Sequence, residues 1–285
     1  MKKIGLGILI GVVGVVLTVS VASALPEKAK IASPTINNEG DVVAPPEEDI
    51  VAPPEFAPVP FPQLPESELT KIVFIRYAPG LEPICDGDHV CDPKENWKNC
   101  PGDCPKGGEE PTPTACYAFL SGGKPKWNLV EPYVYNDLSL EGPSANAVNT
   151  WEAPVSGDIF GVGSYATGYD WGKYDYTNSA TYGDYDDTGK CLTSEPCVIA
   201  VTAIWFRAKN IYEYDIMFDR DFFPETGVWA YDLPTVTLHE FGHGAGLNDL
   251  YDTACSGNVM YGYYHGVDLD LGPGDATGIQ TLYGI

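Results

Sequence analysis

The chain has 285 residues, of which 40 are Asp or Glu and 16 are Lys or Arg, and its formal net charge at pH 7 is -24. Phosphate contacts require Lys and Arg, so this balance argues against nucleic-acid binding and fits a soluble exported protein. The length allows one or two domains of ordinary size. Eight cysteines in an exported chain predict four disulfides.

The first 24 residues have the pattern of an export signal. Residues 1–3 include two lysines, residues 4–21 are apolar, and residues 22–24 are Ala-Ser-Ala. A charged start, an apolar middle and an A-x-A end predict cleavage after residue 24. If it stays uncut, the apolar run is long enough to span a bilayer. The rest of the chain is expected to be secreted or held at the cell surface, with membrane contact only through this segment.

Residues 25–69 are rich in Pro, Glu and Ala, and residues 41–47 are nearly repeated at residues 49–55. Proline removes backbone donors and keeps the chain extended, so we expect a disordered linker or propeptide here.

Residues 70–104 combine a short strand with a cysteine cluster. The residues of Lys71–Tyr77 are mostly β-branched or aromatic, which predicts the strand. A segment of about 20 residues cannot bury a core, so two disulfides are expected among Cys85, Cys91, Cys100 and Cys104. The segment resembles short calcium-holding modules of extracellular proteins, and its candidate calcium ligands are Asp86, Asp88, Asp92, Glu95 and Asp103. Residues 105–115, rich in Gly and Pro, are predicted to be a second linker.

Residues 116–285 form a domain-sized block. Local patterns in it predict strands at Trp127–Tyr135, Val198–Arg207 and Ile211–Phe218, helices at Ser144–Trp151 and Asp275–Leu282, and exposed loops over Gly157–Lys190. Asp232 is a plausible N-cap, and Pro234 fits the first turn of a further helix. Cys191 and Cys197 could close a local loop, which would leave Cys116 to pair with Cys255.

The residues from His239 to Asp249 give the most specific chemical signal in the chain. His239 and His243 are four residues apart, so on a helix both can direct a ring nitrogen at one metal ion. Glu240 lies beside that ion and can take a proton from a metal-bound water. Gly246 can adopt a positive φ and end the helix, which turns Asp249 back toward the metal as its third ligand. Asp252 and His265 are the alternatives for that ligand.

These residues resemble the signature of the metzincin zinc endopeptidases, in which H-E-x-x-H-x-x-G-x-x-H/D is followed by a Met-turn. Residues 256–262 correspond to that turn and place Met260 beneath the metal. Two more segments, Ile211–Phe218 and Asp275–Gly284, are similar to the matrixin branch. Matrixins usually have His as the third ligand, whereas Asp249 is similar to the snapalysin group. The related gluzincin class needs a downstream Glu, and none follows Glu240.

The resemblance implies an α+β fold of the metzincin type, with a twisted mixed sheet, an active-site helix and a small C-terminal subdomain. It implies a Zn²⁺-dependent endopeptidase that acts on proteins or peptides, with Glu240 as general base. An extended substrate would pair with an edge strand within Val198–Arg207. Residues after the Met-turn would shape the pocket or stabilise the oxyanion, namely Tyr261, Tyr263, Tyr264 and His265. Calcium is the structural ion to expect, and the sequence does not indicate an oligomeric state.

The sequence allows two further interpretations, one of the function and one of its regulation. An acidic, non-catalytic surface protein with a vestigial metal site is the alternative function, and the intact Glu240 argues against it. Cys85 could in principle hold the enzyme latent by binding the zinc, as a propeptide cysteine does in some matrixins. Its surroundings do not match that switch motif, and the neighbouring cysteines offer disulfide partners.

Overall fold

The structure is a computed structural model that describes residues 63–81, 115–186, 191 and 196–285, together with two short strands near the N-terminus. The chain divides into two compact units, Met1–Pro60 and Phe61–Ile285. In the first unit, β1 (Thr35–Ile36) pairs antiparallel with β2 (Val42–Val43). The predicted export signal, the cysteine cluster and the second linker lie outside the described residues.

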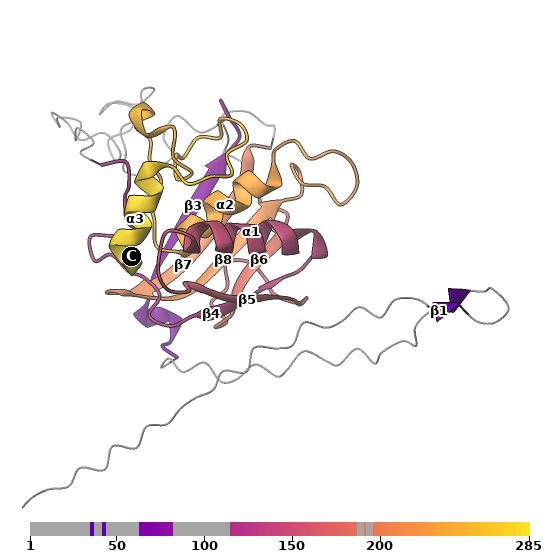
Figure 1. The fold of residues 1–285 in the computed structure, drawn as a ribbon, viewed down its shortest axis with the longest axis horizontal. Coiled ribbons are helices and arrows are strands. Elements are labelled where there is room, and N and C mark those ends of the chain that lie inside the picture. Colours follow the sequence, from indigo (N-terminus) through magenta and orange to yellow (C-terminus); the bar gives the residue numbers. More distant parts are fainter. Residues whose placement is uncertain (1–34, 37–41, 44–62, 82–114, 187–190, 192–195) are drawn as a thin grey trace, which may run out of the picture. The chain divides into compact units, whose positions relative to one another are not determined.

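The second unit is built on a sheet in which the described residues supply six strands, in the order β3-β7-β8-β6-β4-β5 (Figure 1). The strands are β3 (Thr70–Tyr77), β4 (Glu131–Tyr135), β5 (Phe160–Tyr165), β6 (Asn178–Gly183), β7 (Val198–Arg207) and β8 (Asn210–Asp219). Strands β5, β4, β6 and β8 pair in parallel, whereas β7 and β3 are antiparallel additions. The mixed sheet confirms the expected α+β class.

Two helices, α1 (Glu141–Glu152) and α2 (Leu233–Gly244), lie over the same face of the sheet, and α3 (Pro273–Tyr283) is the last helix before the C-terminal residue (Figure 1). As predicted, Asp232 caps α2, because its carboxylate accepts a hydrogen bond from the Thr235 amide at 3.0 Å. None of the helices in the described part of the chain is long and apolar enough to cross a membrane. Short 3₁₀ turns occur at Glu66–Glu68, Leu138–Leu140 and Thr253–Cys255.

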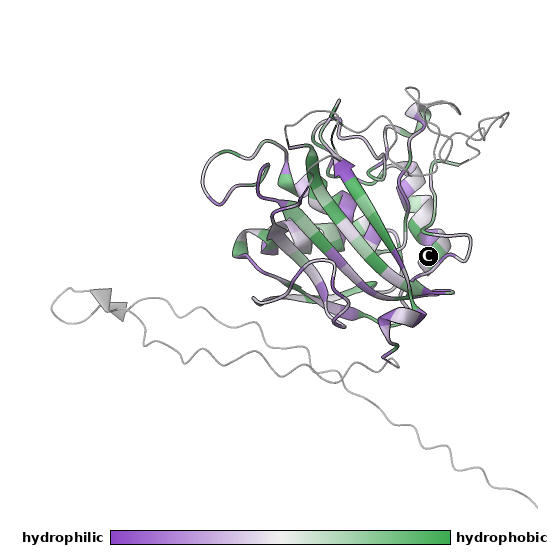
Figure 2. Cartoon of the chain, turned by 180° about the vertical axis from the view of Figure 1, so that it is seen from behind, coloured by the Kyte–Doolittle hydropathy of each residue, from purple (hydrophilic) through white to green (hydrophobic). Residues whose placement is uncertain are grey.

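The main core fills the space between the helices and the sheet. The largest side chains in it, Trp151, Tyr214, Phe218 and Phe241, are completely buried. Burying one such side chain stabilises a fold by roughly 2 kcal/mol. Seen from the side opposite the helices, the strands have both hydrophobic and hydrophilic residues along their length (Figure 2). A second, smaller core on Cys197, Val198, Val201 and Met217 is packed against the sheet.

The prediction that residues 157–190 form only loops is wrong, because this segment contains β5 and β6. Its glycines, which suggested loops, allow β5 to lie close against β4. A Cβ at Gly161 would lie 2.7 Å from the Pro132 nitrogen, and one at Gly163 would lie 2.5 Å from Cζ of Tyr133. Packing with distant residues therefore outweighs local composition here.

The strand predicted within residues 70–104 forms as β3, and it pairs along its whole length with β7. Consequently β7 lies inside the sheet, between β3 and β8, and does not offer the free edge expected for Val198–Arg207. The sheet therefore includes a strand that precedes the block 116–285 in the sequence.

The described residues include two disulfides, and both match the predicted pairings. Cys116 bonds to Cys255, joining segments 139 residues apart, and Cys191 bonds to Cys197 in a local loop. The long loop closed by the first bond restricts the unfolded chain and so stabilises the fold, by about 5 kcal/mol in the chain-entropy account. Disulfides persist in oxidising compartments, which indicates an extracytoplasmic location.

Candidate metal centre

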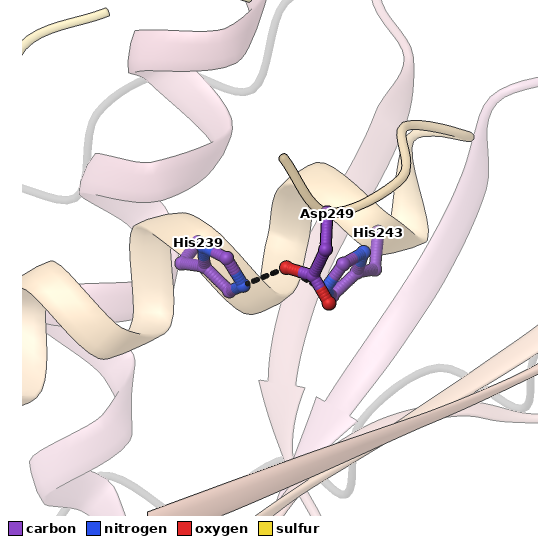
Figure 3. Close-up of side chains that lie close together, drawn as sticks. All are labelled: His239, His243 and Asp249. Carbon is purple, nitrogen blue, oxygen red and sulfur yellow. Dashed lines mark ion pairs between the residues drawn. The ribbon is translucent and has the colours of Figure 1, made fainter. Parts of the chain in front are cut away.

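His239, His243 and Asp249 converge on one point at the C-terminal half of α2 (Figure 3). Nε2 of His239 lies 3.0 Å from Oδ1 of Asp249, and Nε2 of His243 lies 3.5 Å from the same oxygen. One potential ligand atom from each of the three residues lies within 4.8 Å of the others. No other group of three such residues occurs in the described part of the chain.

The far nitrogen of each histidine ring is held by the backbone. Nδ1 of His239 is 2.7 Å from the Val259 carbonyl, and Nδ1 of His243 is 3.0 Å from the Leu247 carbonyl. A carbonyl only accepts, so each Nδ1 bears the hydrogen, and a neutral ring then presents a lone pair at Nε2.

Three acceptor atoms therefore face one another in a buried space. Nε2 of His243 and Oδ1 of Asp249 have no hydrogen-bond partner. Such an arrangement is unfavourable unless a cation lies between the atoms. Two imidazole nitrogens and one carboxylate oxygen are ligands that Zn²⁺ takes in catalytic sites, so these residues fit that ion.

The electrostatics of the three side chains favour the protonation states that a metal requires. Burial lowers the pKa of both histidines, and Arg76 lowers that of His239 further. Burial alone would raise the pKa of Asp249, but its interactions with His243, His239 and Arg76 outweigh this and lower the pKa to about 2. Of these interactions, the one with Arg76 persists when both imidazoles are neutral, and it favours the ionised carboxylate that a metal requires.

The chain turns sharply at Gly246, which directs Asp249 back over the helix. Gly246 has φ of +106°, as its predicted role requires, and a Cβ there would lie 2.6 Å from the Pro125 carbonyl oxygen. The hydroxyl of Tyr251 donates to Oδ2 of Asp249 at 3.1 Å, which leaves Oδ1 directed at the histidines. No local sequence pattern predicts this role for Tyr251.

Glu240, on α2 between the two histidines, is buried. Its Oε2 accepts a hydrogen bond from the hydroxyl of Thr202 on β7 at 2.5 Å, and its Oε1 has no partner. Burial raises the pKa of Glu240, against opposing effects of His243, Arg76 and Thr202. The carboxylate is therefore held at one oxygen and left with a free, more basic one at the other.

Met260 lies in a turn that packs against α2. A Cβ at Gly242 would collide with Sδ of Met260, so the glycine allows this close approach. The carboxylate of Asp275, at the start of α3, accepts hydrogen bonds from the amides of Val259 at 2.6 Å and of Met260 at 3.2 Å. This network connects α3 to the carbonyl that orients His239.

The sequence matches a known protein family, and the match includes the residues of this centre. The family model described as "Peptidase_M10: Matrixin" matches residues 81–284, well over half of the chain. The chain belongs to the matrixin family. Matrixins are zinc peptidases, so the family supports Zn²⁺ as the metal of the centre. No curated protein matches the sequence.

In this matrixin the alternative third ligands are engaged elsewhere. Asp252 caps the short helix at Thr253–Cys255 by accepting from the Ala254 amide at 2.7 Å. His265 is exposed and packs edge-on against Tyr261, with ring centroids 5.6 Å apart. The structure therefore brings Asp249, and neither alternative, to the two histidines.

The residues expected to shape a substrate pocket form an aromatic group after the Met-turn. Tyr263 packs edge-on against both Tyr251 and Tyr261. Tyr264 packs edge-on against Tyr231 and accepts a hydrogen bond from the Asp232 amide at 3.2 Å through its hydroxyl oxygen. The five candidate calcium ligands of the cysteine cluster lie outside the described residues.

Strand β3 covers the metal centre, which sequence reasoning did not foresee. The ring of Phe74 stacks on that of His243, with centroids 3.9 Å apart and planes within 8°. Arg76 is buried, interacts electrostatically with Glu240 and Asp249, and donates to the Tyr261 carbonyl at 3.4 Å. The two residues lie more than 160 positions before the centre, and no local pattern could have linked them to it.

Proposed function

We propose that the chain is an exported zinc-dependent endopeptidase that hydrolyses internal peptide bonds, with Glu240 as general base. One observation carries this proposal. Potential ligand atoms of His239, His243 and Asp249 face one another in a buried space, and the free Oε1 of Glu240 lies on the same helix as the two histidines. Membership of the matrixin family supports the same reaction class.

We propose that His239, His243 and Asp249 hold the zinc through Nε2, Nε2 and Oδ1. Bound zinc supplies a water of lowered pKa and a positive charge that polarises the scissile carbonyl. An aspartate ligand brings negative charge to the centre, as in the snapalysin group. The bound water is therefore expected to be somewhat less acidic than with three neutral imidazoles.

In this scheme Glu240 moves the proton. Its Oε1 would accept a proton from the attacking water and deliver it to the leaving amine. Thr202 keeps the other oxygen in place, so the carboxylate does not have to reorganise during the reaction. Tyr261 or Tyr263 would donate to the developing oxyanion, and His265 would border the pocket beyond the scissile bond.

We also propose that the protein acts outside the cytoplasm after cleavage of residues 1–24. Calcium bound by the cysteine cluster would then serve as a structural ion. The two disulfides and the acidic composition are compatible with this setting.

Release of peptides from denatured casein tests the proposal. The zinc-loaded full-length chain is compared with Glu240→Ala, and each is also prepared with Phe74→Ala, because Phe74 covers the centre. We expect release only from forms that retain Glu240, its loss on chelation and its return with Zn²⁺. If no folded, zinc-loaded form releases peptides in a Glu240-dependent manner, the proposed function is wrong.

A further inference from the structure

The outer edge of β7 is the natural docking site for an extended peptide, and it is already occupied. A peptide that binds by strand addition uses the free N–H and C=O groups of an edge strand. On β7 these groups pair antiparallel with β3, in a register that runs from Thr70 opposite Phe206 to Tyr77 opposite Val198. A second peptide cannot pair there while β3 remains.

The side chains of β3 also fill the space above the metal centre. Ile72, Phe74 and Arg76 alternate along the strand, so they project to one side of the sheet. Phe74 is directly opposite Thr202, the residue that holds Glu240. Phe74 then stacks on His243, while Arg76 donates to the Tyr261 carbonyl and interacts electrostatically with the two carboxylates of the centre. The strand therefore blocks both the sheet edge and the reacting groups.

The extent of the family match indicates that β3 is an addition to the catalytic fold. The match begins at residue 81, four residues after β3 ends at Tyr77. Without β3, the sheet of the matched part would end at β7, next to Thr202 and Glu240. The edge strand predicted for the substrate would then be free.

We propose that β3 is an internal occupant of the peptide-binding groove, which keeps the enzyme latent until the strand is displaced or cut away. The inference rests on the proposed function, because it assigns the groove to a peptide substrate. It also defines what the groove accepts, namely an extended segment with alternating inward aliphatic, aromatic and basic side chains. The groove binds an added peptide only in molecules from which β3 has left. The apparent affinity is therefore the intrinsic affinity multiplied by the fraction of such molecules.

The structural alternative is that β3 is a permanent sixth strand. Its other face does pack on the smaller core, where Ile75 and Tyr77 contact the cluster formed by Cys197, Val198, Val201 and Met217. The two possibilities differ in what happens when the contacts with the metal centre are weakened. A latency strand leaves and exposes a groove, whereas a permanent strand stays or the protein unfolds.

Binding of a labelled peptide separates these outcomes without relying on catalysis. A fluorescent peptide with the sequence of residues 69–79 is titrated into full-length Glu240→Ala protein, and binding is followed by fluorescence anisotropy. Phe74→Ala and, separately, Arg76→Gln are introduced into this background. The control is Val73→Ala, because Val73 is on the same strand, is 40% exposed and points away from the centre.

We expect Phe74→Ala and Arg76→Gln to tighten peptide binding at least tenfold and Val73→Ala to change it less than twofold. Equal affinity in all folded variants would overturn the proposal, and so would failure of both inward variants to fold, since β3 would then be structural. Tighter binding without casein release from the Glu240 forms would leave the latency proposal standing and refute the proposed function. Casein release that is equally fast with and without Phe74→Ala would refute latency alone.

Discussion

The carboxylate of Asp275 accepts a hydrogen bond from the Val259 amide at 2.6 Å, and the carbonyl of Val259 lies 2.7 Å from Nδ1 of His239. One residue of the turn therefore connects α3 to a metal-binding imidazole. The same carboxylate also accepts from the amides of Met260 and Gly272. Asp275 thus sets the position of the turn and, through it, the orientation of His239.

Replacement of Asp275 by alanine is expected to weaken both the fold and the metal site. Three buried amides lose their acceptor, and one such group costs about 1–3 kcal/mol. We expect the free energy of unfolding to fall by about 3 kcal/mol, and zinc affinity to fall by roughly tenfold or more. Urea unfolding and competition with a chelator measure the two effects. The nearby exposed residue Asp270 provides the control, and an Asp275→Ala protein that binds zinc as tightly as Asp270→Ala would contradict the assignment.

Thr202→Val should impair catalysis without removing the metal. Glu240 would lose the hydrogen bond at Oε2, and a bond to a charged group contributes about 1.5–3 kcal/mol. We expect kcat/KM of the peptidase to fall at least tenfold, with the zinc content unchanged. Thr202→Ser retains the hydroxyl and should recover most of the rate. Steady-state kinetics on a fluorogenic peptide, with all forms carrying Phe74→Ala to free the groove, test this, and a serine variant as slow as the valine variant would refute the role of the hydroxyl.

Much of the site could be predicted because its signals are local. The spacing of His239, Glu240 and His243 follows from the helical repeat, and the positive φ of Gly246 follows from its position after them. The helix start at Asp232 and the strands at Val198–Arg207 and Ile211–Phe218 were also anticipated, within a residue of the observed bounds. Each of these features depends on neighbouring residues.

The remaining features depend on pairs of residues that are distant in the sequence. Thr202 contacts Glu240, 38 positions later in the sequence, and Phe74 contacts His243, 169 positions later. Strand β5 was missed because its glycines serve close packing against β4 and not a turn. Such contacts arise only once the sheet order is known, and no periodicity within a single segment specifies it.

Tyr251→Phe should reduce zinc affinity while leaving the fold intact. The hydroxyl donates to Oδ2 of Asp249 at 3.1 Å and so directs Oδ1 to the histidines. Loss of a group that orients a metal ligand typically lowers metal affinity by 10- to 100-fold. Competition with a chromogenic chelator would measure the dissociation constant. Tyr165→Phe is the control, because Tyr165 is 51% exposed on β5, and a zinc affinity equal in both variants would exclude the proposed orientation.

Two glycines in helices offer a matched test of the packing beneath α2. A Cβ at Gly242 would collide with Met260 and with Cζ2 of Trp151, 2.6 Å away, whereas a Cβ at Gly142 meets nothing within 4 Å. Gly242→Ala is therefore expected to destabilise the protein by about 1–3 kcal/mol. Gly142→Ala should stabilise it by up to about 1 kcal/mol, because alanine favours the helix. Thermal unfolding of both proteins decides this, and a neutral Gly242→Ala would show that Met260 can move aside.

A pair of buried carboxylates on the opposite side of the sheet should make stability depend on pH. Burial raises the pKa of Glu213 to about 9, and repulsion from Asp215 adds to this; burial also raises the pKa of Asp215 to about 7. Both folded-state values exceed the ordinary range of these groups. The folded protein therefore binds more protons than the unfolded chain, and the stability contributed by the protonated form is lost as the pH rises through these values.

Glu213→Gln removes one of these titrations. We expect the wild type to lose stability relative to Glu213→Gln between pH 5 and pH 8.5, by at most about 1.4 kcal/mol for each pH unit. The amides of Asp175 and Tyr176 donate to Glu213, so the variant itself should be less stable at pH 5, where the wild-type carboxyl is protonated in the folded protein. Urea unfolding at both pH values gives the difference, with the exposed Asp158→Asn as control. A difference between wild type and Glu213→Gln that stays constant with pH would show that Glu213 titrates at its ordinary value, with water reaching the carboxylate in the folded protein.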